Sequence, residues 1–301
     1  MKDIMTQATN KITIVGKLLD ASFASGKTST GGKPYERANL TIRVTQTYGG
    51  RTETSEVPVS AFATQYTNKG SINPAYESLQ KLKEFKTVQN VGIDNADTIR
   101  ITGGDLSENA FVSKSGQLVN GWQLRSSFFN PGKTDDTATF NVDIFIMDMK
   151  EEFDREGETT GRLIIKGAIV QYGGRLDVVE FIVEAPDCVD YISNNWEPNQ
   201  TVNVGGRIRY TVQEEKRAAV ESSWGEELPE TSTRTVRELI VTRGSDEPFE
   251  EDLAYDPTDI KKAFNERKAR LEQLQLDAKT KTKTTKSAST APAKKDAYSW
   301  E

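Results

Sequence analysis

Alternation of apolar and polar residues is the feature that most constrains the fold of this chain. In residues 35–46, Ala38, Leu40, Ile42 and Val44 alternate with polar residues, a pattern typical of a strand with one buried face. Residues 74–87 change to a helical spacing of apolar residues. The first 130 residues therefore predict three strands, a helix and two further strands, with a Gly-rich polar stretch at 103–121 between the last two.

The same order of elements recurs in residues 138–244, after a polar linker at 130–138. Apolar alternation predicts five more strands, a short helix near 187–195 and a polar loop at about 214–232. Residues 48–51 and 172–175 both read Tyr-Gly-Gly-Arg, and both lie between the second and third strands of their half. This repeat favours duplication, although Gly-Gly is also a common hairpin turn.

The composition changes after residue 244. Residues 245–256 are acidic, and Asp256-Pro257 predicts the start of a helix that ends near residue 278. Residues 279–301 begin with a tract rich in Lys, Thr, Ser and Ala, which predicts a disordered tail. We therefore predict a mainly β fold with two tandem units of five strands, at 1–130 and 138–244, an acidic segment and helix at 245–278, and the tail.

The residues that are missing restrict the chemistry. The chain has no histidine and one cysteine, which excludes Ser-His-Asp and Cys-His hydrolases, zinc-histidine sites and an internal disulfide. It has no apolar run of 18 residues, and its first residues lack a signal core. We expect a cytoplasmic protein that is not an enzyme and has no cofactor, metal site or membrane contact, although a carboxylate-only metal site stays open.

The net charge of −6 is unevenly distributed. Residues 1–130 carry 15 basic and 11 acidic residues, a net charge of +4, whereas residues 131–244 carry 13 and 22, a net charge of −9. A polyanion would therefore bind more readily to the first unit than to the second. Ordinary scatter of charge is the alternative interpretation.

Two five-stranded units with a helix between their third and fourth strands match the oligonucleotide-binding (OB) barrel. Residues 10–18 (NKITIVGKL) and 38–44 (ANLTIRV) resemble the first two strands of bacterial and phage single-stranded DNA-binding proteins, and residues 201–209 (TVNVGGRIR) resemble their fourth strand. The usual stacking tryptophan of the third strand is absent, since Glu56 and Val57 occupy that place. Two barrels in one chain would suit a phage or mobile-element version.

The resemblance implies a groove in which basic side chains contact phosphates and aromatic rings stack on bases. The candidate contact residues are aromatic, basic or amide residues that alternation, turns or loops place outside the barrels: Tyr35, Arg37, Asn39, Arg43, Tyr48, Arg51, Phe62, Tyr66, Arg100, Trp122, Tyr172, Arg175, Arg207 and Arg209. For these residues the alternatives are solvated strand faces, turn chemistry or core packing. Trp122 is balanced between core and groove, and Trp224 in its acidic loop favours a packing or partner role.

The resulting hypothesis is sequence-tolerant binding and protection of single-stranded DNA in phage-type replication or recombination, in the cytosol of the host if the chain is phage-encoded. Replication or recombination proteins would dock on the acidic segment 246–252 or on the C-terminal tail. The alternative is a structural or assembly module that uses its barrels to contact proteins, which the −9 charge of the second unit favours.

Overall fold

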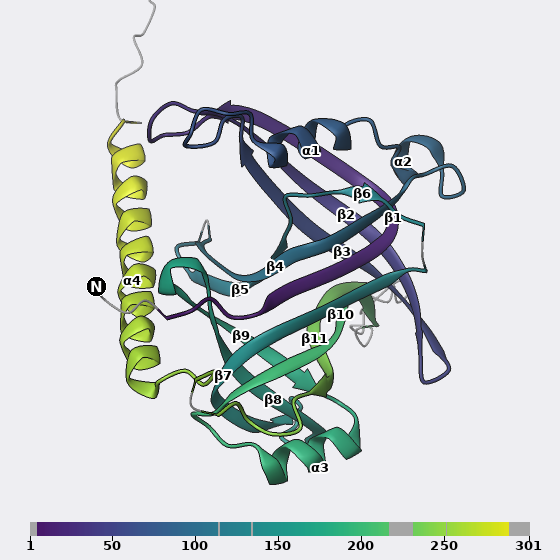
Figure 1. The fold of residues 1–301 in the computed structure, drawn as a ribbon, viewed down its shortest axis with the longest axis vertical. Coiled ribbons are helices and arrows are strands. Elements are labelled where there is room, and N and C mark those ends of the chain that lie inside the picture. Colours follow the sequence, from purple (N-terminus) through teal and green to yellow (C-terminus); the bar gives the residue numbers. More distant parts are fainter. Residues whose placement is uncertain (1–4, 114, 134, 217–230, 251, 289–301) are drawn as a thin grey trace, which may run out of the picture.

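The protein is described by a computed structural model, which covers residues 5–288 except 114, 134, 217–230 and 251. Within this part, the strands form one continuous sheet that closes into two rings (Figure 1). The first ring contains β1 (Asn10–Lys27), β2 (Pro34–Tyr48), β3 (Arg51–Thr64), β4 (Thr98–Val112) and β5 (Leu118–Arg125). It closes where β1 pairs with β4, in addition to β2.

The second ring repeats this order of pairing. It contains β7 (Thr137–Phe153), β8 (Thr159–Val170), β9 (Leu176–Val183), β10 (Thr201–Lys216) and β11 (Thr231–Gly244), and it closes where β10 pairs with β7. In both rings the third and fifth strands pair in parallel, and the other pairings are antiparallel. The prediction of a mainly β chain with two OB-like barrels and a C-terminal helix is confirmed, whereas the predicted domain boundaries stay predictions.

A direct pairing of β1 with β7 joins the two rings. The register runs from Asn10 opposite Val142 to Val15 opposite Thr137. Two hydrogen bonds extend the pairing, because Thr9 accepts from the Asp143 amide at its carbonyl and donates its own amide to the Asp143 carboxylate. The barrels therefore share one hydrogen-bonded sheet.

Alternation placed the strand residues correctly. Ala38, Leu40, Ile42 and Val44 are all buried. In the second barrel the rings of Phe140 and Phe181 pack with centroids 5.6 Å apart. Within the described residues, no helix combines the length and the apolar character needed to cross a bilayer.

The helices follow their predicted start signals but not all of their predicted ends. The α1 helix (Pro74–Leu82) begins after Asn73, whose side chain accepts a hydrogen bond from the amide of Ala75. It ends five residues before the predicted limit, and a short α2 (Val88–Val91) follows. The α3 helix (Pro186–Asn195) occupies the predicted position in the second barrel.

The C-terminal helix α4 (Pro257–Ala288) runs ten residues beyond its predicted end. The helix thus extends into the first part of the segment 279–301, which was predicted as a tail. Residues 289–301 lie outside the described part. In Figure 1, α4 runs along the same side of both barrels, and it contacts β4 of the first and β9 of the second.

Two segments predicted as irregular are strands. Most of the stretch 103–121 belongs to a long hairpin of β4 and β5, in which Phe111 is opposite Val119. Asn130 and Pro131, assigned to the linker, form the short strand β6 beside β4. Neither segment was predicted as a strand, because both are rich in glycine and polar residues. Strands of a hairpin that face solvent need few apolar residues.

Gly16 lets β1 lie close to the neighbouring strand β2. A Cβ atom at this position would lie 2.3 Å from the carbonyl oxygen of Arg43 on the neighbouring strand. Only glycine permits such a close approach of two backbones. The register shift of β1 lies further on, between Leu18 and Asp20.

Candidate nucleic-acid interface

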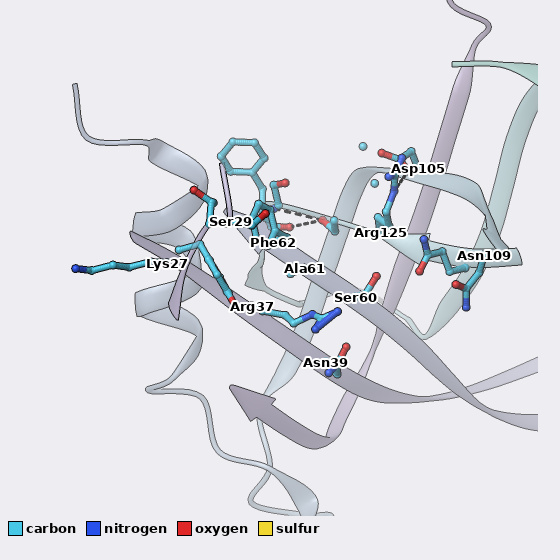
Figure 2. A pocket seen from close by; sticks show the side chains of 18 residues that line it. Lys27, Ser29, Arg37, Asn39, Ser60, Ala61, Phe62, Asp105, Asn109 and Arg125 are labelled. Atoms are coloured by element: carbon cyan, nitrogen blue, oxygen red, sulfur yellow. Dashed lines mark hydrogen bonds and ion pairs between the residues drawn. The ribbon is translucent and has the colours of Figure 1, made fainter. Parts of the chain in front are cut away.

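A cleft of about 1160 Å³ lies on the outer face of the first barrel. Figure 2 shows Lys27 and Ser29 on one side of this cleft, Arg125, Asp105 and Asn109 on the other, and Arg37 and Asn39 between them. The lining comes from the end of β1 and the loop after it, from β2 to β5, and from the segment after β5. Its residues are Lys27, Thr28, Ser29, Tyr35, Arg37, Asn39, Ser60, Ala61, Phe62, Gly103, Gly104, Asp105, Asn109, Gln123, Arg125, Ser126, Ser127 and Phe128.

The alternation of β2 delivers three predicted residues to this cleft. Because Ala38 and Leu40 point into the core, Tyr35, Arg37 and Asn39 point outward. Antiparallel pairing with β3 places Phe62 opposite Arg37. Four of the predicted contact residues therefore line one surface.

Two exposed aromatic side chains give the cleft stacking surfaces. Phe62 is 53% exposed, and its ring lies 5.1 Å from that of Tyr35 with the planes tilted by 37°. Phe128, also 53% exposed, lies in the segment after β5. An exposed ring offers a face to an unstacked base, and stacking of this kind contributes about 1–3 kcal/mol per base.

Three cationic side chains line the cleft, and they differ in whether another residue pairs with them. Arg37 and Lys27 are exposed, and no hydrogen bond or ion pair joins either side chain to the described part of the chain. The Arg125 guanidinium is paired with Asp105, with 2.8 Å between Nε and the carboxylate oxygen, and both side chains are 38% exposed. Arg37 and Lys27 are thus available to a phosphate, whereas Arg125 must first leave Asp105.

A buried carboxylate supports the cleft from below. Glu36, between Tyr35 and Arg37 in sequence, is 2% exposed and points inward. Burial acts to raise its pKa, but the Lys83 ammonium and hydrogen bonds from Gln80 and Ser25 outweigh burial and lower it. The ionised Glu36 thereby links the start of β2 to the end of β1 and to the α1 helix.

A second group of predicted residues joins the barrels instead of lining the cleft. Arg207 and Arg209 of β10 both pair with Glu53 of β3, at 2.8 Å, and with Glu184. Tyr48 packs under the Arg207 guanidinium, which lies 4.6 Å from the ring centroid. Arg207 points out of its own barrel, as predicted, but the first barrel covers it and its side chain is buried at the junction of the two barrels, where it is not open to nucleic acid.

Trp122 belongs to the core and not to the groove. It is 8% exposed, because it shares the inward face of β5 with Leu124. The Arg237 guanidinium of the second barrel lies 4.9 Å from its ring centroid and donates to its carbonyl oxygen.

The remaining predicted residues lie apart from the cleft. Arg43 pairs with Glu56 across the strands at 3.0 Å, and Arg175 pairs with the buried Asp177 at the same distance. The others are exposed, at the β2–β3 turn, after β3, on β4 and in the turn before β9; they are Arg51, Tyr66, Arg100 and Tyr172. Trp224 lies outside the described residues.

Sequence reasoning missed fourteen of the 18 lining residues, among them the charged Lys27, Asp105 and Arg125 and the aromatic Phe128. The signal for Arg125 was present, because the buried Trp122 and Leu124 alternate with outward Gln123 and Arg125. Phe128 and Lys27 gave no such signal, since both flank strands in segments without periodicity. In the described part of the chain, no group of three His, Cys, Asp or Glu side chains is arranged to hold a metal ion.

Comparison with known proteins gives a family and a structural neighbour. A search of solved structures finds a deletion mutant of the single-stranded DNA-binding protein from Thermus aquaticus, with 14% identity, a TM-score of 0.48 and coverage of 84% of this chain and 99% of that one. A search of curated proteins finds no match. A scan against protein families matches one, described as YorF, over residues 8–277. Because this match spans most of the sequence, the chain belongs to the YorF family.

Proposed function

We propose that the protein binds single-stranded DNA, without strong sequence preference, in the cleft of its first barrel. The observation that carries this proposal is the placement of two exposed aromatic rings, Phe62 and Phe128, in one open cleft with two cations, Arg37 and Lys27, that no described residue pairs with. Sequence-tolerant binding needs these two elements, because rings accept any base and cations neutralise phosphates. Binding and protection require no catalytic group.

The exposed rings of the cleft favour a flexible single strand over a duplex. Bases must be unpaired and unstacked before they can lie against Phe62 or Phe128, and a duplex keeps its base faces covered. The cleft offers backbone and amide groups, such as Asn39, that accept or donate hydrogen bonds to any base edge. We therefore expect selection for strandedness and little selection for sequence.

The test is a titration of a fluorescently labelled oligo-dT, followed by anisotropy at 50 and 200 mM salt. If Lys27, Arg37 and Arg125 each neutralise one phosphate, the affinity falls about 20-fold between these concentrations, since each contact contributes about −0.7 to the salt slope on a log scale. A labelled strand is the appropriate probe because Trp122 and Trp196 are buried, so their fluorescence reports poorly on the cleft. A labelled duplex of the same length is the control.

Arg37→Ala localises the interaction. We expect weaker binding and a salt slope reduced by about 0.7, because one phosphate contact is lost. Arg100→Ala is the matched control, since Arg100 is exposed on β4 but does not line the cleft. No binding at 50 mM salt, or equal affinity for the duplex, would overturn the proposal.

The biological setting belongs to the same proposal. We propose that the protein protects single strands during phage-type DNA replication or recombination in the cytoplasm, and that partner proteins dock on the acidic segment 246–252. Part of this segment is held to the second barrel, because the Phe249 amide donates to the carbonyl of Thr201. Copurification of a replication or recombination protein with the intact chain, and its loss when Asp246 and Glu247 are neutralised, would support this setting.

A further inference from the structure

The second barrel has a face equivalent to the cleft of the first barrel. The rings pair their strands in the same order, so that β8, β9 and β11 correspond to β2, β3 and β5. In the first barrel the outer side of these strands lines the open cleft. In the second barrel the same side lies next to α4, which contacts β9 (Figure 1).

The covered face carries both apolar and charged side chains. Beneath α4 a space of about 650 Å³ remains, where Ile164, Val178 and Ile182 of the barrel face Phe264 and Leu271 of the helix. Both sides of β9 are consequently buried, which is unusual for an outer strand, and only Glu180 of its residues is exposed. Unlike the cleft of the first barrel, the described residues that line this space include no exposed aromatic ring.

Two arginines of α4 anchor the helix to acidic residues of both barrels. Arg267 donates to Glu108 of β4, with its Nε atom 2.9 and 3.0 Å from the two carboxylate oxygens, and both side chains are buried. Arg270, one turn later, lies 3.5 Å from Glu108 and 3.7 Å from Asp177 of β9. Asp177 also accepts from the amide of Glu108, so the three groups join β4, β9 and α4.

The charges at this face disfavour nucleic acid. Glu152, Glu180 and Glu238 line this space and would repel a phosphate. Two of the three cations that line it, Arg237 and Arg267, already have partners. Arg237 is held between the rings of Trp122 and Tyr210, and Lys166 is opposite Glu180 in the strand register. An amphipathic helix fits this chemistry, because it brings apolar residues and arginines at i and i+3 on one face.

We propose that the outer face of β8, β9 and β11 is a helix-binding surface, which α4 fills within the same chain and thereby closes to nucleic acid. The ligand class is an amphipathic helix with apolar residues at the positions of Ile260, Phe264 and Leu271 and basic residues at those of Arg267 and Arg270. The chain then has one nucleic-acid cleft and one peptide-binding face. This inference does not depend on the function proposed for the first barrel.

The experiment releases α4 and offers its sequence back as a separate peptide. The full chain carrying Arg267→Glu and Arg270→Glu keeps the acidic anchors but repels its own helix. A labelled synthetic peptide of residues 255–278 should bind this variant at least tenfold more tightly than the unaltered chain, whose face is filled. The matched control is the same peptide with glutamate at positions 267 and 270, which should not bind.

A second variant keeps the test decisive if the first does not fold. Phe264→Ala with Leu271→Ala weakens the apolar contacts of α4 and leaves both arginines in place, and circular dichroism monitors folding of each variant. The inference is overturned if the peptide binds no folded variant, if it binds the unaltered chain equally well, or if release of α4 adds a second equivalent of bound oligo-dT. The last outcome would make the face a nucleic-acid site.

Discussion

The outer faces of the two barrels are built from the same strands in the same order, but they differ in what covers them. On the first barrel, β2, β3 and β5 present Arg37 and Phe62 to solvent. On the second, β8, β9 and β11 present apolar residues interspersed with charged ones, next to α4. The comparison teaches that a barrel topology sets where a binding surface lies, whereas the outward residues of three strands decide what it binds.

An arginine lies at each face, and removing the one that anchors α4 has the largest expected effect on stability. Arg267→Ala should lower the free energy of unfolding by about 3 kcal/mol, because it leaves the buried Glu108 with only the weaker contact from Arg270. Affinity for oligo-dT in the first barrel should stay unchanged. Urea denaturation measures the stability, and Lys268→Ala, at the next and exposed position, is the control.

If Arg267→Ala instead leaves the stability unchanged, the helix is not anchored by its ion pair. The covered face would then depend on apolar contacts alone. If the variant loses affinity for oligo-dT while it remains folded, the two faces are coupled, and the contrast drawn between them is wrong.

Phe62→Ala tests the open face. Loss of one stacking ring should weaken the binding of oligo-dT by about 1–3 kcal/mol, or roughly 5- to 150-fold, with no comparable change in stability because Phe62 is half exposed. Phe153→Ala is the matched control, since Phe153 is 59% exposed at the end of β7 in the second barrel. Anisotropy measures both, and equal losses in the two variants would contradict the assignment of the cleft.

Asp105→Asn should act in the other direction. Asp105 holds Arg125 at 2.8 Å, so it competes with a phosphate for this guanidinium. Exposed ion pairs of this kind contribute about 0.2–1 kcal/mol, and the variant should therefore bind oligo-dT up to about fivefold more tightly. An unchanged affinity would mean that Arg125 does not contact the strand.

The last prediction concerns the pH dependence of stability, which acts only in strongly alkaline solution. Tyr255 lies just before α4, and its hydroxyl donates a hydrogen bond to the carbonyl of Thr6. Burial, followed by the nearby Asp143 carboxylate, raises the pKa of Tyr255 to about 12. Because the folded chain holds this proton more tightly than the unfolded chain, the stabilisation is complete below pH 10 and is lost as the pH rises through about 12. The difference in phenolate absorbance between the protein and Tyr255→Phe should therefore show a midpoint near pH 12, and a midpoint near 10 would contradict the packing of this segment.

Local pattern predicted much of the fold because periodicity and cap residues act within a few positions. The alternation of Ala38 to Val44 gave the inward face of β2, and Asn73 gave the start of α1. The same reasoning placed Tyr35, Arg37 and Asn39 outward. It missed β6 and the last ten residues of α4, where weak local signals are decided by neighbouring strands or by helix propagation.

The candidate site was predicted only in part because orientation does not give location. Alternation puts Arg43 and Arg37 on the same side of β2, but Arg43 forms an ion pair with Glu56, while no described residue pairs with Arg37. The Tyr-Gly-Gly-Arg repeat suggested equal roles for Tyr48 and Tyr172. Instead Tyr48 packs against Arg207 of the other barrel, whereas Tyr172 is 88% exposed in a 3-10 turn. Such differences arise from contacts between segments distant in sequence.

The pairing of β1 with β7 also has a consequence for how this molecule reaches its native state. During synthesis the strands of the first ring are made first. One edge of β1 stays unpaired until β7, which follows more than a hundred residues later, has been made. Until β7 pairs with it, this edge of β1 exposes backbone donors and acceptors to other nascent chains. Once β1 and β7 are paired, the two rings should unfold in a single cooperative transition. Separating the rings would break the backbone hydrogen bonds between β1 and β7 as well as the side-chain contacts between the barrels.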